Sequence, residues 1–260
     1  MSVEQHEPTP TDPEEPRRIY TPIADTPLVY RREPGDAHPP LDYEPYKSTA
    51  LRHPKEPLVY LPHTLGEITG PALSERLGMT ELDADLTRQH AGEPIGERII
   101  VIGHVYDTEG KPLRDTLVEI WQANACGRYR HRWDRYPAPL DPNFSGAGRC
   151  LTDAEGRYRF TTIKPGPYPW GNHYNAWRPA HIHFSLMGRA FAQRLVTQMY
   201  FPGDPFFPYD PIFNSVRDPR AREAMISTFS IHGTQPDWAQ CFEWDIYLRG
   251  PAATFFEEEL

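Results

Sequence analysis

The sequence is poor in cysteine, in positive charge and in long apolar runs. Its three cysteines, Cys126, Cys150 and Cys241, are too few for the disulfide framework of a small secreted protein. The formal charge of −9 disfavours nucleic acid and anionic membranes as partners. No run approaches the roughly 20 apolar residues of a membrane span, and residues 1–16 lack the basic and apolar regions of a secretory signal. We therefore expect a cytoplasmic protein that binds neither nucleic acid nor membranes.

Proline, in contrast, is abundant. There are 30 prolines among 260 residues, more than twice the usual share of about 5%. Each proline removes a backbone donor and clashes with the preceding helical turn, which excludes a helical bundle. Short β-branched runs bounded by Gly and Pro turns indicate strands at 97–107, 116–125, 157–163, 180–186, 194–201 and 241–249. We therefore expect an all-β fold with a β-sandwich core and few short helices.

The chain divides into three parts by composition. Residues 1–16 are acidic and rich in Pro and Thr, and we expect a disordered arm there. Residues 17–95 are irregular with scattered Tyr and Leu, which is typical of a segment that wraps a core or a partner. Residues 96–260 hold the strands and the candidate site. The expected helices are 72–77, 81–90 with Thr80 as its N-cap, and 219–229.

The sharpest local motif is His181-Ile182-His183 within a predicted strand. Side chains at i and i+2 of a strand point to the same face, with Cα atoms roughly 6.5–7 Å apart. Two imidazoles placed in this way can converge on one metal ion. The pattern fits equally well a pair of strand histidines that are hydrogen-bonded to their neighbours.

Three segments around this motif add further candidate groups. Prolines on either side of Tyr168 restrict the backbone that carries its ring. Arg178 precedes Pro179, which forces it into an extended conformation. Tyr129 lies in the basic stretch GRYRHR, where nearby positive charge favours a phenolate. Taken alone, an arginine-rich loop is more often a solvated or ion-paired turn.

Together, four blocks in order resemble the intradiol ring-cleaving dioxygenases: GRYRHRWDRY, LDPNFSGAGRCLTDAEGRY, IKPGPYPWGNHYNAWRPAHIHFS and TQMYFPGDP. The resemblance covers about residues 43–250 and implies a β-sandwich, in agreement with the strand pattern. It also implies a mononuclear non-haem Fe(III). Its ligands in the family are two tyrosinates and two histidines, which match Tyr129, Tyr168, His181 and His183. Two phenolates and one hydroxide balance the charge of Fe(III), a hard ion that favours anionic oxygen.

The resemblance assigns further roles by position. It implies that Tyr168 leaves the metal and takes a substrate proton, while Tyr129 stays bound. Arg178 stabilises the negative charge that develops on the substrate, and Gln198 belongs to the same hydrogen-bond network. Trp170 and Ile212 line the pocket, and Tyr46 meets a substrate carboxylate. The remaining histidines are expected to be non-ligands, among them His104, His131, His173 and His232.

Within the family, the resemblance is strongest to members that cleave protocatechuate to 3-carboxy-cis,cis-muconate, a step of the β-ketoadipate pathway. Those members are hetero-oligomers of an iron-bearing β subunit and an iron-free α subunit. One alternative is a single-chain member acting on catechol or hydroxyquinol. Such members usually carry a helical N-terminal dimerisation region, and residues 1–70 are too rich in Pro for one. A second alternative is a metal-free binding protein that kept the sandwich fold.

Overall fold

The structure is a computed structural model that describes residues 39–56, 78–107, 109–188 and 191–248. These residues all belong to one unit of the chain, Glu33–Leu260. The expected arm at 1–16, the expected helix at 72–77 and most of the irregular segment 17–95 lie outside the described residues. Within the described ranges, the structure contains no helix that is long and apolar enough to cross a membrane.

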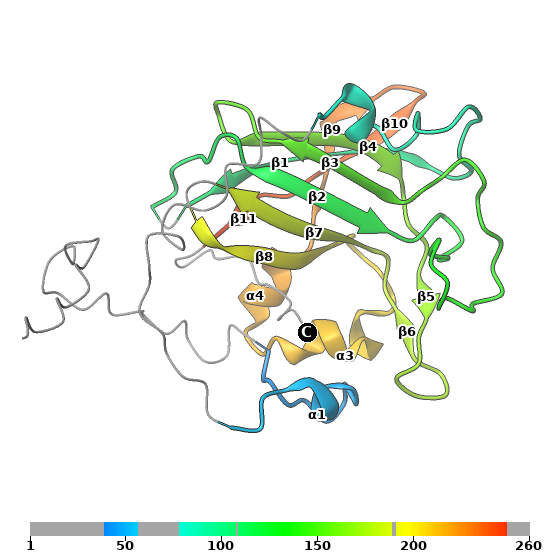
Figure 1. Cartoon of the computed structure of the whole chain (residues 1–260), viewed down its shortest axis with the longest axis vertical. Coiled ribbons are helices and arrows are strands. Elements are labelled where there is room, and N and C mark those ends of the chain that lie inside the picture. The colour runs from blue at the N-terminus through cyan, green and yellow to red at the C-terminus, as the bar shows by residue number, and fades with distance from the viewer. Residues whose placement is uncertain (1–38, 57–77, 108, 189–190, 249–260) are drawn as a thin grey trace, which may run out of the picture. The chain divides into compact units, whose positions relative to one another are not determined.

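Two sheets and one short strand pair make up the architecture (Figure 1). In the first sheet the strand order is β11-β1-β10-β9, and β4 pairs with β1. Its strands are β1 (Arg98–Tyr106), β4 (Arg157–Ile163), β9 (Thr228–Gln235), β10 (Ala239–Glu243) and β11 (Ile246–Tyr247). The second sheet has the order β3-β2-β7-β8, from β2 (Leu117–Gln122), β3 (Ala147–Leu151), β7 (His181–Gly188) and β8 (Phe191–Tyr200). The separate pair is β5 (Tyr168–Pro169) with β6 (Trp177–Arg178).

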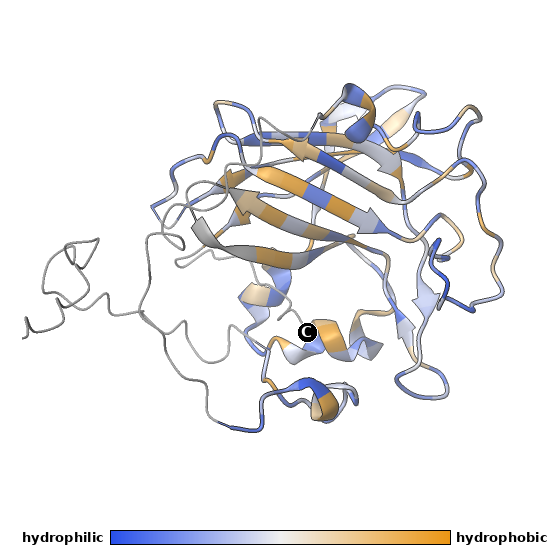
Figure 2. Cartoon of the chain, viewed as in Figure 1, coloured by the Kyte–Doolittle hydropathy of each residue, from blue (hydrophilic) through white to orange (hydrophobic). Residues whose placement is uncertain are grey.

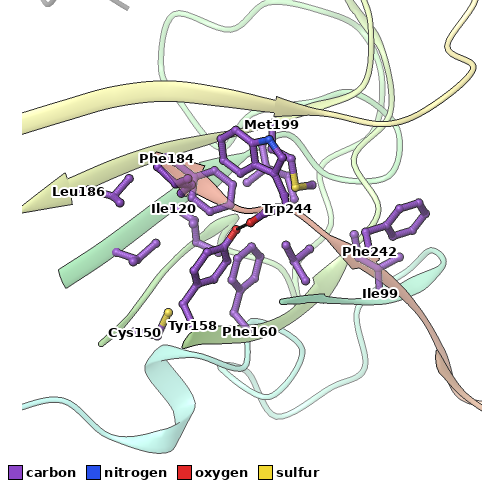
Figure 3. Close-up of a cluster of buried hydrophobic side chains, with 14 of the residues drawn as sticks. Ile99, Ile120, Cys150, Tyr158, Phe160, Phe184, Leu186, Met199, Phe242 and Trp244 are labelled. Carbon is purple, nitrogen blue, oxygen red and sulfur yellow. Dashed lines mark hydrogen bonds between the residues drawn. The ribbon is translucent and has the colours of Figure 1, made fainter. Parts of the chain in front are cut away.

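The core lies between the two sheets and is built by alternation along the strands. On β7, Ile182, Phe184 and Leu186 are fully buried, and along β2 buried residues alternate with half-buried ones from Val118 to Gln122, while hydropathy varies along both strands (Figure 2). The Phe184 ring lies 5.8 Å from Tyr158 of the facing sheet and 4.8 Å from Trp244, centroid to centroid (Figure 3). Burying one such side chain is worth about 1.5–3 kcal/mol. The even positions of β7 therefore hold the strand in place and leave its odd positions for the opposite face.

The predicted strands are confirmed, but one of them is divided into two shorter strands. The expected strand at 241–249 is two strands, β10 and β11, separated at Trp244 and Asp245. Four strands were not predicted: β3, whose sequence AGRCL has little β-branching, β9, and the two-residue strands β5 and β6. The sandwich class predicted from the turns and strands is correct.

The expected helix at 81–90 is wrong. Only a 3-10 turn, Glu81–Asp83, forms, with the Asp83 carboxylate accepting from the N–H and hydroxyl of Thr80. The residues that follow instead pair with strand β4, because Leu86 donates to Thr161 O and Thr161 donates to Ala84 O. Sheet pairing outweighs the local helix propensity here.

The other helices are short. They are α1 (Thr49–Arg52), the 3-10 turn η2 (Phe207–Tyr209), α3 (Pro211–Ser215) and α4 (Pro219–Ala224). The expected helix at 219–229 ends five residues early, since Ser227 donates to Tyr200 O and leads into β9. Both α3 and α4 begin with Asp-Pro, and each Asp side chain accepts the backbone N–H two residues later. Side chains from both helices pack with Tyr200 at the end of β8.

Candidate metal and active site

Strand register brings the candidate side chains to one place. In the β7–β8 pairing, His181 lies opposite Tyr200 and His183 lies opposite Gln198. Directly opposite residues of an antiparallel pair share a face, so these four side chains lie on the face away from the core. In the short pair, Tyr168 on β5 lies opposite Arg178 on β6, and β7 begins three residues after Arg178.

Three donor atoms meet at this junction. Tyr168 Oη lies 3.2 Å from His181 Nε2, which in turn lies 3.2 Å from His183 Nε2. The same-face placement predicted for the two histidines is therefore present. Ligands about 2.0–2.1 Å from a metal ion are separated from each other by about 3 Å. The three atoms thus already have the spacing of neighbouring ligands of one ion.

Tyr129 reaches the same place from a loop. Its ring lies 5.2 Å from the Tyr168 ring and 6.4 Å from the His183 ring, and its hydroxyl is buried. Gly127 allows this approach: it has φ +75°, and a Cβ there would lie 2.1 Å from Pro167 O. The Asp134 carboxylate accepts the backbone N–H of Tyr129 at 2.8 Å and fixes the loop beyond it.

The surroundings hold His181 as a neutral imidazole. Burial lowers the pKa of His181 well below its usual value, and the positive charge of Arg178 lowers it further. Its Nδ1 lies 2.7 Å from Pro179 O, so the ring proton resides there and the Nε2 lone pair faces Tyr168 and His183. Burial raises the pKa of Tyr168, although Arg178 and a hydrogen bond from Tyr129 oppose this.

The donor set fits a hard metal ion. Two imidazole nitrogens and two phenol oxygens combine ligands that suit iron, and metal binding deprotonates such phenols. Elsewhere among the described residues, no group of three or more His, Cys, Asp or Glu side chains is placed to hold a metal ion. Any site here therefore depends on the two tyrosines as well as the two histidines. His183 is further held by parallel stacking on Trp121, with ring centroids 4.8 Å apart.

Arg178 lies next to these donor atoms and is itself buried. Its Nη1 is 3.1 Å from His181 Nε2 and 3.5 Å from Tyr168 Oη. Its Nη2 donates to Gln198 Oε1 at 2.6 Å and to Tyr200 Oη at 2.9 Å. A salt bridge to the Asp210 carboxylate completes this network. The structure therefore brings together Arg178 and Gln198, as predicted from the sequence.

Of the three expected pocket residues, one lies beside Arg178 and a second packs against the first. Trp170 lies with its ring centroid 6.0 Å from Arg178 Cζ, and Tyr46 packs edge-on against Trp170 at 5.2 Å. Asn172 holds the Tyr46 segment in place, because its side chain bonds Lys47 N and Pro45 O. Ile212 is on α3, two residues after Asp210.

The four histidines expected to be non-ligands and the three cysteines, all within the described residues, lie outside the cluster. His104 pairs with Asp245 on the first sheet, and His131, His173 and His232 are exposed. Burial raises the pKa of the Cys150 thiol to about 12 and also raises the pKa of Cys241, whereas Cys126 is exposed. Two residues of the network, Tyr200 and Asp210, were not predicted. Tyr200 is two residues after Gln198 on one strand, a same-face signal that was available in the sequence.

Comparisons with known proteins agree with this geometry. A family model described as dioxygenase matches residues 68–250. A second model, described as protocatechuate 3,4-dioxygenase beta subunit N terminal, matches residues 30–64. The protocatechuate 3,4-dioxygenase beta chain of Burkholderia cepacia is 54% identical over 236 residues, covering 90% of this chain and 99% of that one. The chain belongs to the intradiol dioxygenase family.

Other members of the intradiol dioxygenase family are more distant. The protocatechuate 3,4-dioxygenase alpha chain of Pseudomonas putida is 28% identical over 208 residues, covering 77% of this chain and 98% of that one. The crystal structure of 3-chlorocatechol 1,2-dioxygenase from Rhodococcus opacus 1CP superposes with a TM-score of 0.50 and 25% identity, covering 64% of each chain. Intradiol dioxygenases are in general non-haem iron enzymes, which is consistent with the donor set found at the junction.

Proposed function

We propose that this chain is the iron-bearing subunit of an enzyme that cleaves protocatechuate between its two hydroxyl-bearing carbons. Protocatechuate and O2 combine to give 3-carboxy-cis,cis-muconate, and both oxygen atoms enter the product. The observation that carries the proposal is that His181 Nε2 lies 3.2 Å from both Tyr168 Oη and His183 Nε2, in a chain 54% identical to a protocatechuate 3,4-dioxygenase beta chain.

Four side chains would hold the mononuclear Fe(III): Tyr129, Tyr168, His181 and His183. When bound, ferric iron draws electron density from a chelated catechol, so that the ring reacts directly with O2. The neutral state of His181 supports its place among the ligands, because only an unprotonated imidazole nitrogen can bind a metal.

Tyr168 is assigned the second task of accepting a proton. Its Oη would accept a proton from an incoming catechol hydroxyl. Burial raises the pKa of this phenol, which favours the protonated form once the oxygen no longer binds a metal ion. Arg178 Nη1, 3.5 Å away, holds this oxygen in position.

Arg178 supplies the positive charge for the ring chemistry. A buried guanidinium beside the donors stabilises negative charge that develops on the substrate, and Gln198 orients it through the 2.6 Å hydrogen bond. Trp170, Ile212 and Tyr46 form the walls of the substrate pocket. In support of this, the Trp170 ring centroid lies 6.0 Å from Arg178 Cζ, and Tyr46 packs against Trp170.

The working enzyme is a hetero-oligomer of this chain with an α subunit. The named relatives are separate beta and alpha chains, and the beta-subunit N-terminal model matches residues 30–64. That match also disfavours the single-chain catechol and hydroxyquinol enzymes, whose relatives cover only about half of this chain, 52% in each case. Large exposed side chains, available for such a partner to cover, are Trp133, Leu140, Tyr174 and Tyr209.

The test is metal content and oxygen uptake with a matched pair of histidine variants. The protein, co-expressed with its α subunit, should contain iron and show the broad visible absorption of tyrosinate bound to Fe(III). It should consume O2 with protocatechuate. His183→Ala should lose the colour and the activity, whereas His232→Ala, which replaces an exposed histidine on β9, should keep both. Zinc in an active preparation, or a colourless active protein, would refute the proposal.

A further inference from the structure

Asp210 is a fully buried carboxylate that joins two parts of the site. Its side chain has no solvent exposure, and that of its partner Arg178 is 4% exposed. A buried charge is tolerated only when it is paired and hydrogen-bonded. The contacts of Asp210 therefore identify the groups that its buried charge holds in position.

One carboxylate oxygen holds the arginine. Asp210 Oδ2 accepts from Arg178 Nη2 at 3.1 Å and from Arg178 Nε at 3.3 Å. These two nitrogens form one edge of the planar guanidinium, so binding both fixes the plane of the group. The remaining nitrogen, Nη1, is thereby directed toward Tyr168 Oη and His181 Nε2.

The other oxygen holds the pocket wall. Asp210 Oδ1 accepts the backbone N–H of Ile212 at 3.0 Å and begins helix α3. The backbone of Asp210 is anchored in turn, because its N–H donates to Phe206 O. The same side chain thus sets the orientation of Arg178 and the position of Ile212.

We propose that Asp210 is a positioning residue, which holds the Arg178 guanidinium in its catalytic orientation and ties that orientation to the Ile212 wall of the pocket. This inference rests on the proposed function of Arg178. Asp210 makes no hydrogen bond to the four donor side chains, and it contacts the pocket only through the backbone N–H of Ile212. Its charge also acts on the nearby Tyr168 phenol, and the double variant described below isolates the part of its effect on turnover that passes through Arg178.

The two Asp-Pro helix starts provide a matched control. Asp218 begins α4 as Asp210 begins α3, and it accepts Arg220 N at 2.9 Å. Its ion-pair partner Arg220 is exposed, with 90% of its side chain accessible. Asp210→Asn keeps a capping oxygen for Ile212 but removes the charge that holds Arg178. Asp218→Asn makes the same chemical change at a helix start that does not contact the site.

The experiment is a double-substitution cycle in the assembled, iron-loaded enzyme. Asp210→Asn should retain the iron and its visible absorption, and should lower kcat for protocatechuate at least 10-fold. Asp218→Asn should leave kcat and iron unchanged. In an Arg178→Ser background, adding Asp210→Asn should cause no further loss of kcat, because the arginine through which Asp210 acts is already absent.

A stability measurement complements the rates. Arg178→Ser leaves the Asp210 charge buried without its partner and should lower the melting temperature, and adding Asp210→Asn should recover part of that loss. Wild-type kcat in Asp210→Asn, or losses that multiply in the double variant, would overturn the inference. If the wild-type holoenzyme fails to oxidise protocatechuate, the proposed function fails instead, and recovery of the melting temperature still tests the Asp210–Arg178 pair.

Discussion

At the scale of single residues, the two tyrosines of the cluster have different surroundings. Tyr168 lies on β5 with Arg178 Nη1 at 3.5 Å, whereas Tyr129 lies in a loop whose backbone is held by Asp134. A cation beside Tyr168 Oη can hold that oxygen when it leaves a metal ion. Tyr129 has a fixed backbone suited to a ligand that stays.

This difference leads to a kinetic prediction. Tyr168→Phe should keep iron but slow the association of protocatechuate, because the group that leaves and accepts a proton is gone. Tyr129→Phe should instead change the colour of both the resting enzyme and the substrate complex. Stopped-flow mixing followed at visible wavelengths measures both effects. Unchanged association kinetics in Tyr168→Phe would contradict the role assigned to it.

The site residues differ in how far the sequence could predict them. The same-face placement of His181 and His183 follows from strand alternation, whereas their proposed role as ligands, together with the two tyrosines, follows from the family resemblance. Asp210 could be recognised as a helix start, because it precedes Pro211. Its pairing with Arg178, 32 residues earlier in the chain, depends on where α3 packs against β8. No local pattern carries that information.

At the scale of elements, two glycines bring the tyrosine-bearing segments together. Besides Gly127, a Cβ on Gly166 would lie 2.4 Å from Ala125 O. The loop that carries Tyr129 and the segment that leads to Tyr168 are thus packed backbone to backbone. The separation of the two tyrosine rings depends on the absence of side chains at these glycines.

Gly127→Ala should therefore damage the metal site as well as the fold. A left-handed backbone costs a non-glycine residue about 1–2 kcal/mol, and contact with Pro167 O adds to this cost. We expect a lower melting temperature and reduced iron content. Gly171→Ala is the control, since a Cβ there meets nothing within 4 Å, and its effect should stay within about 0.5 kcal/mol. Full iron occupancy in Gly127→Ala would show that the loop tolerates displacement.

Elements were predicted accurately where local sequence stabilises them, and inaccurately where contacts with distant parts of the chain do. Strands with β-branched residues, such as 157–163, were predicted at their observed bounds, since their burial pattern is visible in the sequence. The helices at 81–90 and 219–229 were over-extended. In both places the backbone hydrogen-bonds to a neighbouring strand instead. The first segment bonds to Thr161 of β4, and the second bonds to Tyr200 of β8. Such pairing is a tertiary effect that local propensity does not contain.

At the scale of the whole molecule, the question is which cation binds the carboxylate of the substrate. Arg178 is already engaged with Asp210, Gln198 and the donor cluster. Within this chain, Arg52 Cζ lies 4.6 Å over the ring of Tyr46, the residue expected to meet that carboxylate. We nevertheless expect the α subunit to supply a positively charged residue as well, because Arg178, the other cation at the site, is already committed to Asp210 and the donor cluster.

Expression of the chain with and without its α subunit tests this expectation. The chain alone should show lower solubility, lower iron content and a higher KM for protocatechuate than the assembled enzyme, because its exposed aromatic side chains and the carboxylate end of the pocket lack their cover. Catechol, which has no carboxylate, should show a smaller change in KM on assembly. Arg52→Ala in the assembled enzyme separates the two sources of charge: a small effect on the KM for protocatechuate assigns the carboxylate to the partner. Full specific activity and an equal KM in the isolated chain would refute the hetero-oligomer and leave Arg52 as the cation that this pocket uses.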